Sequence, residues 1–106
     1  MALTPHDAYR QRATQNVAYN AAAGASTQSA AFGSQTRYIR VVSPGLLSAS
    51  IDGVRIAVGE NPTATATSAL LPVQWMQHLK VSPGQKIAVL GNNTGTGSVN
   101  VTELTD

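Results

Sequence analysis

Apolar and polar residues alternate with a period of two through most of the chain after residue 25. Apolar residues separated by a single position recur along it, as in the pairs Ile39/Val41, Ile87/Val89 and Val99/Val101. The side chains of a strand point alternately to its two faces, so this pattern is typical of half-buried β-strands. We count about eight such runs at spacings of about 8–12 residues, which predicts an all-β antiparallel sandwich or barrel.

The runs are separated by turn residues, and one turn sequence occurs twice. Val-Ser-Pro-Gly stands at positions 42–45 and again at positions 81–84. Proline restricts φ at the second position of a turn, and glycine accepts the positive φ of the third, so each copy predicts a type II turn. Two similar corners favour a jelly-roll-like sandwich over residues 25–106, while an immunoglobulin-like strand order stays open.

A different turn is predicted where Asp52-Gly53 separates two alternating runs. Asp-Gly is a strong hairpin signal because both turn positions need a positive φ. We therefore expect residues 47–51 to pair with residues 54–58.

Residues 1–24 differ from the rest, and we predict an N-terminal arm that is extended or contains a short helix. Thr4, Pro5 and Asp7 stand where a helix cap, a first helical residue and the acid of a capping box would stand. The apolar residues of this segment form no stripe at helical spacing, so it would make a poor core helix. We expect an intermolecular contact to hold the arm, and we assign that contact to Tyr9, Arg10, Arg12, Val17 and Tyr19.

Charged residues make up only 11% of the 106 residues, and cysteine is absent. Small soluble domains usually carry about a quarter charged residues, so this composition suits a protein whose faces are covered by neighbours. The arginines near the N-terminus are not accompanied by a cluster of lysines, so the signal for nucleic-acid binding is weak. We expect no nucleic-acid partner. No apolar run approaches the length of about 20 residues that a membrane span needs, and the N-terminus lacks signal-peptide features. We expect a chain made in the cytoplasm, with no membrane partner.

Residues that carry catalysis or bind metal are few. The chain has two histidines and five carboxylates, namely His6, His78, Asp7, Asp52, Glu60, Glu103 and Asp106. A zinc site needs three or four ligands, and only His6 and Asp7 are adjacent. The glycine-rich run 91–97 lacks the lysine of a phosphate-binding loop and precedes a predicted strand. The sequence therefore predicts a protein that is no enzyme, with no catalytic residue, no metal and no cofactor.

Trp75 is the single tryptophan, and two interpretations of it stay open. A lone tryptophan in a β-sandwich favours a core position or a subunit contact. The other interpretation is a platform on which a sugar ring stacks, which generally needs a second exposed aromatic side chain. Tyr38 could supply that side chain only if the two strands are neighbours.

Residues 67–104 resemble small β proteins of tailed-bacteriophage virions. The likeness is carried by Leu70-Leu71-Pro72, by Val81 with the run Pro83-Gly84-Gln85-Lys86, by Ala88-Val89 and by the closing run 100–104. The first half of the chain takes no part in it. The resemblance implies a capsid decoration (cement) protein, commonly a β-sandwich homotrimer seated where capsomers meet, and it implies no catalytic residues.

From this resemblance we expect a structural virion protein on the capsid surface that stabilises the phage head by bridging capsid subunits. Its partners would be the major capsid protein or another virion protein, together with further copies of itself. The interface would combine the arm residues named above with Tyr38 and Trp75. The alternative is a carbohydrate-binding β-sandwich module of a phage tail or fibre, which requires Trp75 to be exposed.

Overall fold

The computed structural model describes residues 10–20, 26–43, 53–72, 75–92 and 97–105. Every regular element within these ranges is a β-strand, so the all-β prediction is confirmed. The strands are β1 (Arg10–Tyr19), β2 (Thr27–Gln28), β3 (Tyr38–Ser43), β4 (Val54–Gly59), β5 (Ala69–Leu71), β6 (Trp75–Lys80), β7 (Lys86–Gly91) and β8 (Gly97–Thr105). Across the described ranges there is no helix with the length and apolarity to pass through a bilayer.

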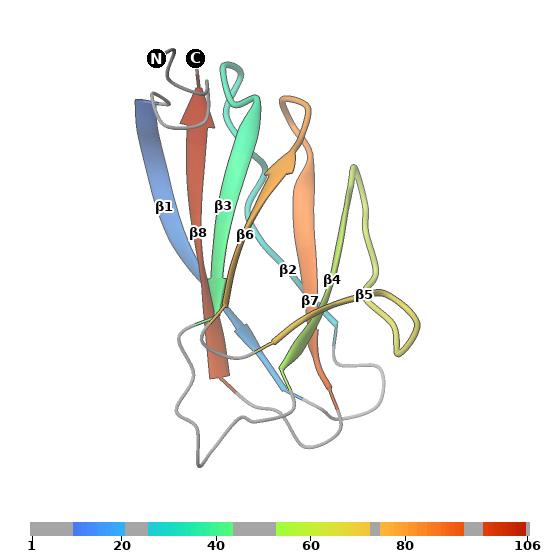
Figure 1. Cartoon of the computed structure of the whole chain (residues 1–106). Coiled ribbons are helices and arrows are strands. Elements are labelled where there is room, and N and C mark those ends of the chain that lie inside the picture. The colour runs from blue at the N-terminus through green and yellow to red at the C-terminus, as the bar shows by residue number, and fades with distance from the viewer. Residues whose placement is uncertain (1–9, 21–25, 44–52, 73–74, 93–96, 106) are drawn as a thin grey trace.

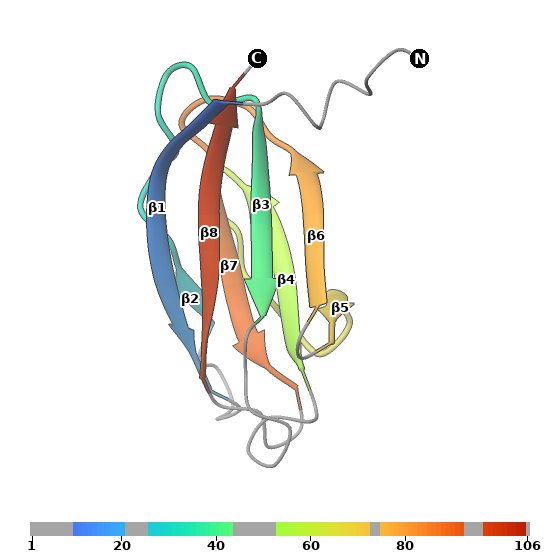
Figure 2. The ribbon, with the colours of Figure 1, turned by 60° about the vertical axis from the view of Figure 1, so that its left-hand side comes forward.

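The strands form two four-stranded antiparallel sheets that pack face to face (Figures 1 and 2). Sheet A has the order β1-β8-β3-β6, and sheet B has the order β2-β7-β4-β5. The first strand therefore pairs with the last, the second with the seventh, the third with the sixth and the fourth with the fifth. This is the order obtained when one long antiparallel hairpin is wound into a barrel-like roll, so the sandwich is a jelly roll. It is not the immunoglobulin-like order.

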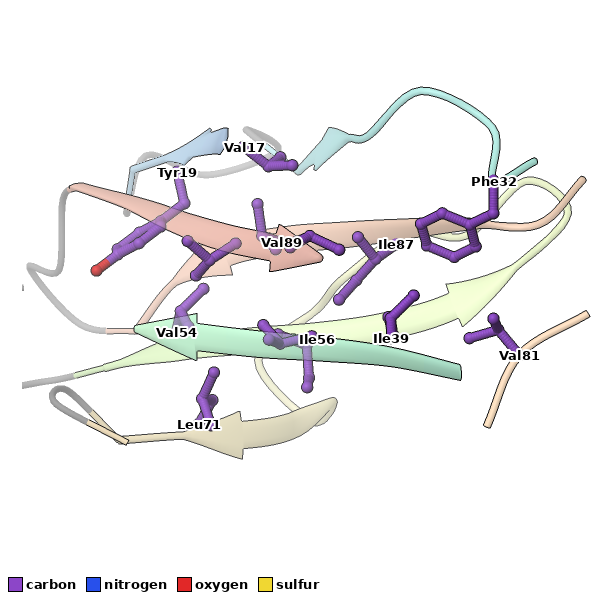
Figure 3. Packing of buried hydrophobic residues seen from close by; sticks show 13 residues of the cluster. Val17, Tyr19, Phe32, Ile39, Val54, Ile56, Leu71, Val81, Ile87 and Val89 are labelled. Atoms are coloured by element: carbon purple, nitrogen blue, oxygen red, sulfur yellow. The ribbon is translucent and has the colours of Figure 1, made fainter. Parts of the chain in front are cut away.

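The core lies between the two sheets and is built from the alternation seen in the sequence. Along β3, Ile39, Val41 and Ser43 are buried, whereas the residues between them are half-buried. Figure 3 shows the side chains of both sheets meeting in this layer. The cluster consists of Val17, Tyr19, Phe32, Ile39, Val41, Val54, Ile56, Leu71, Val81, Ile87, Val89, Val99 and Val101. Burying each aliphatic side chain of this size stabilises the fold by about 1.5–3 kcal/mol.

The predicted boundary after residue 24 needs correction, because β1 is a strand of the sandwich itself. It pairs with β8 from Arg10 opposite Thr105 to Tyr19 opposite Gly97. Val17 and Tyr19 are 4% and 2% exposed and belong to the core. The segment is extended, as one form of the prediction had it, but cross-strand hydrogen bonds and core packing hold it within its own chain. Residues 1–9 and 21–24 lie outside the described residues.

The second Val-Ser-Pro-Gly copy forms the type II turn that its sequence predicts. The N–H of Gln85 donates to the carbonyl oxygen of Ser82 at 3.2 Å, and Gly84 has φ +83°. The turn carries the chain from β6 in sheet A to β7 in sheet B. Phe32 holds it in place, because the Phe32 carbonyl accepts from the N–H of Gly84 at 3.0 Å. Pro44 and Gly45 of the first copy lie outside the described residues.

The hairpin predicted at Asp52-Gly53 is not formed by β4. Gly53 has the expected positive φ, +77°. However, both edges of β4 are already paired over Val54–Ile56, with β7 on one side and β5 on the other. An Asp-Gly pair predicts only the local backbone conformation, whereas the pairing of strands depends on the whole sheet. Residues 47–51, the other half of the predicted hairpin, lie outside the described residues.

Candidate interaction surface

Among the described residues, no pocket and no group of three metal-ligating side chains is found. Of the carboxylates and histidines considered above, Glu60, His78 and Glu103 fall in the described ranges, and the others lie outside them. Glu60 is exposed in the loop after β4, and His78 is exposed on β6. Because these groups converge on no cavity, the surface of the sandwich is the place to look for function.

Glu103 is the buried carboxylate, and the fold explains its position. It is 6% exposed on β8. Its Oε1 accepts hydrogen bonds from the N–H of Gly33 at 2.8 Å and from the hydroxyl of Thr36 at 2.5 Å. Burying a charged group is costly unless it is hydrogen-bonded. These two donors supply that compensation, and they fasten the turn between β2 and β3 to the end of β8.

The structure separates the residues predicted to form one interface. Arg10 and Arg12 are exposed on β1, and the Nη1 of Arg12 donates to the Oε1 of Gln35 at 3.0 Å. Val17 and Tyr19 point into the core and present no contact surface, which corrects their assignment. Tyr9 lies outside the described residues.

The two remaining predicted residues, Tyr38 and Trp75, lie on neighbouring strands but do not form one platform. Tyr38 pairs with Lys80 at one end of the β3–β6 ladder, and Trp75 pairs with Ser43 at the other. Five residue steps along a strand separate the two positions by about 17 Å. Directly paired residues share a face, so Trp75 lies on the inner side with buried Ser43, and Tyr38 lies on the outer side.

Large exposed apolar residues lie on the two edge strands at one side of the sandwich. In the described part of the chain these are Leu70, Trp75 and Met76, which are 43%, 61% and 48% exposed. We call these three residues the edge patch. Leu70 lies on β5 and the other two lie on β6, and these are the edge strands of sheets B and A on the same side of the molecule (Figure 2). The register gives these side chains different directions: Leu70 faces the outer side of sheet B with Arg55, and Met76 faces the outer side of sheet A with Val42. The edge patch is therefore a set of exposed apolar residues along neighbouring sheet edges, and exposed apolar groups of this kind are candidates for interaction.

Sequence analysis placed Trp75 in an interface but missed its companions Leu70 and Met76. In the segment Trp75–Lys80 every residue is exposed except the half-buried Leu79. A strand so little covered needs no alternation of apolar and polar residues, and this one shows none. The sequence signal that could have indicated these exposed residues is a run of strand length in which apolar residues occupy adjacent positions. It could not show that β5 and β6 become neighbouring sheet edges.

The outer face of sheet A forms a second candidate surface. Register places polar residues of β1 and β8 side by side across it: the Thr14 and Thr102 hydroxyls are 3.2 Å apart, and the Asn100 amide donates to Asn16 at 3.1 Å. On the β3 and β6 half, the outward residues include Arg40, His78 and Lys80. We define the outer face by its exposed residues, Thr14, Asn16, Ala18, Met76, His78, Lys80 and Ser98, together with the half-buried residues Tyr38, Arg40, Val42 and Asn100.

The outer side of sheet B is covered by its own chain. The Gln28 amide donates to Asn61 and to the Pro62 carbonyl, both at 2.8 Å, and the Ala64 N–H donates to Ser26 at 2.9 Å. Ala88, which points outward from β7, is fully buried. The outer side of sheet A also includes the buried residues Thr102 and Leu104, but among the described residues it has more exposed positions than the outer side of sheet B.

Comparisons with protein-family models, with curated proteins and with solved structures find no match to this chain.

Proposed function

We propose that this protein is a structural virion protein of the capsid-decoration class, which binds the phage head and stabilises it by bridging capsid subunits. The observation that carries the proposal is an accessible outer face on sheet A next to the exposed apolar residues of the edge patch, on a sandwich in whose described part no pocket is found. Such a molecule can act by adding contact area between subunits. The proposal assigns it no catalytic role and no cofactor.

Two further observations support this proposal. The segment 67–104, which carries the resemblance to virion proteins, contains the whole edge patch together with β7 and all but the last residue of β8. The jelly-roll sandwich also agrees with the fold class that the resemblance implies. The homotrimer implied by the same resemblance stays a prediction.

The proposed contact with the shell moves from the N-terminal segment to the outer face of sheet A. Because Val17 and Tyr19 are needed in the core, the part of the N-terminal segment that forms β1 cannot detach to reach a neighbour. The outer face, in contrast, carries short polar side chains on β1 and β8 and cationic ones on β3 and β6. Repetition of this contact over a symmetric shell raises avidity by about 10²–10⁴ over a single contact when the geometry permits.

Association with assembled heads tests the proposal. The purified chain is mixed with icosahedral heads built from the major capsid protein of the same virus, and bound protein is measured by co-sedimentation. We expect saturable binding and a higher melting temperature of the heads. Absence of binding to such heads would refute the decoration role.

A matched pair of variants tests the surface. Ala18→Glu places a charge among the exposed polar residues of the outer face, and Thr63→Glu places the same charge on the exposed loop over sheet B. We expect Ala18→Glu to weaken head binding by about tenfold or more, because an unpaired charge enters the interface, and Thr63→Glu to leave binding unchanged. Equal binding by both variants would show that the contact with the head does not lie on the outer face of sheet A.

The exposure of Trp75 favours one second candidate, a carbohydrate-binding module of a tail or fibre. A ring that is 61% exposed can stack on a sugar. Tyr38 does not lie beside it, so the site would depend on one aromatic ring. A glycan that shifts the fluorescence of Trp75 in saturable fashion, without head binding, would support this candidate over the first.

A further inference from the structure

The four sheet edges of the described sandwich are not equally protected against pairing with another strand. Natural sheets protect their edges with short strands, bulges, charged residues or covering loops. The edge strands of sheet B are short, since β2 has two residues and β5 has three. In sheet A, β1 is long, but its register shifts between Gln11 and Thr14, and it carries Arg10 and Arg12. Three of the four edges therefore carry recognised protection.

Among the residues that the structure describes, none of these protections is found at strand β6. It pairs with β3 in an unbroken register over six residues, and it is the last strand of its sheet. Within it, only Lys80 carries a permanent charge, and that residue stands at the very end. Trp75 and Met76 are exposed, whereas Leu79 packs partly against the core. A regular edge with exposed apolar side chains is a template for strand addition.

The sequence of β6 is complementary to itself in one antiparallel register. Residues paired with buried β3 positions lie on the inner side, which places Trp75, Gln77 and Leu79 there and Met76 and His78 on the outer side. A two-fold axis perpendicular to the sheet at Gln77 sets Trp75 opposite Leu79 of the second copy. It also sets Met76 opposite His78 of the second copy. This register opposes no two like charges among the described residues. On the inner side it sets two Trp75–Leu79 pairs on either side of a Gln77–Gln77 pair at the axis.

We propose that two copies of this chain associate through β6, pairing antiparallel about Gln77 to join their A sheets into one continuous eight-stranded sheet. An interface of this kind is isologous, because the same strand contributes on both sides. It covers Trp75 and Met76 of both copies. It also doubles the width of the outer face. The inference rests on the strand edges and their register, and it does not depend on the proposed role in a virion.

Sedimentation of the purified chain gives the first test. We expect a concentration-dependent species with twice the 11.0 kDa mass of one chain. We also expect Trp75 fluorescence to shift to shorter wavelength as this species forms, because the indole leaves water. A chain that stays monomeric up to its solubility limit would refute the inference. A trimer would also refute the two-fold β6 contact, and it would favour the symmetry that the resemblance implies.

Charge substitution at the axis tests the register. Gln77→Lys sets two ammonium groups opposite each other, and Gln77→Glu sets two carboxylates opposite each other, so each variant alone should associate at least about tenfold more weakly than the parent. An equimolar mixture of the two variants opposes unlike charges and should restore the dimer. Far-UV circular dichroism checks that both variants are folded.

A control on the protected edge completes the test. Ala13→Lys places the same charge at an exposed position of β1 and should leave the dimer unchanged. If Ala13→Lys abolishes the dimer as well, the contact is not specific to β6. If each Gln77 variant is monomeric and their mixture stays monomeric, the axis is not at Gln77 and the proposed register is wrong. If the chain stays monomeric and β6 instead binds an extended peptide, the partner of β6 is not a second copy, and the proposal is also refuted.

Discussion

At the scale of single residues, Glu103 shows how a side chain with catalytic potential serves the fold. Its carboxylate is enclosed between β8 and the turn that precedes β3, where it accepts hydrogen bonds from Gly33 and Thr36. Thr36 is itself fully buried. Both donors would lose their partner together if the carboxylate were removed.

We expect Glu103→Ala to lower the free energy of unfolding by about 1–3 kcal/mol, since it leaves the buried Thr36 hydroxyl without its acceptor. Glu60→Ala removes a carboxylate that is exposed, and it should change the free energy of unfolding by less than about 0.5 kcal/mol. Urea unfolding monitored by circular dichroism measures both variants. Similar values for the two variants would mean that Glu103 contributes no more than a surface charge.

Three glycines should lose different amounts of stability when each is replaced by alanine, because the backbone geometry differs among the three positions. Gly84 has a positive φ but open space around its Cβ position, so Gly84→Ala should cost about 1–2 kcal/mol. Gly53 has a positive φ, and a Cβ there would lie 2.7 Å from the Leu71 carbonyl oxygen, so Gly53→Ala should cost more. Gly59 has neither constraint, and Gly59→Ala should change stability by less than about 0.5 kcal/mol. Thermal unfolding of the three variants should give this order, and a reversal of Gly53 and Gly84 would contradict the close approach.

At the scale of elements, adjacent residues of β1 differ in burial because they lie on opposite faces of the strand. Val17 points into the core, and Ala18 points to the outer face of sheet A, because the side chains of a strand alternate. An arm held by another protein would show no such difference in the isolated chain. The strand is therefore tested by neighbouring substitutions in a single protein.

We expect Val17→Glu to abolish cooperative folding, because an unpaired carboxylate enters the core. Ala18→Glu should leave the chain folded, with a change in stability of less than about 1 kcal/mol. Unfolding curves in urea compare the two. If Val17→Glu folds as well as Ala18→Glu, β1 does not belong to the sandwich in solution.

At the scale of the whole molecule, the jelly roll joins the two ends of the chain. Arg10 pairs with Thr105, and Thr27 pairs with Val89, so most strand pairs are distant in sequence. Each such pair requires a long loop to close before contacts stabilise it. The wound topology therefore affects how fast the chain can fold as well as how its faces are arranged.

We expect folding in milliseconds to seconds rather than in microseconds, since non-local sheet pairing dominates. Stopped-flow circular dichroism after dilution from urea measures the rate. Trp75 is a poor reporter of this reaction, because it is 61% exposed in the folded monomer. Complete folding within microseconds would contradict a mechanism limited by pairing of distant strands.

The parts of the fold that were predictable from sequence are those that local rules control. Ile39 and Val41, and likewise Val99 and Val101, had to share a face because strand geometry alternates, and all four are fully buried. The type II turn at Ser82–Gln85 followed from proline and glycine alone. The candidate surfaces were not predictable in this way, because Leu70, Trp75 and Met76 come to one side of the sandwich only after β5 and β6 become edges of facing sheets.

The sequence by itself determined that this chain forms half-buried strands divided by defined turns, since alternation and turn chemistry act over a few residues. Only the tertiary structure decided which strands pair, and with that the exposure of every side chain. Val17 and Trp75 were both assigned to an interface, and both lie on edge strands of sheet A, yet Val17 is buried in the core between the sheets and Trp75 is exposed. The physical reason is that burial depends on what covers a face, and the covering strands come from distant parts of the chain.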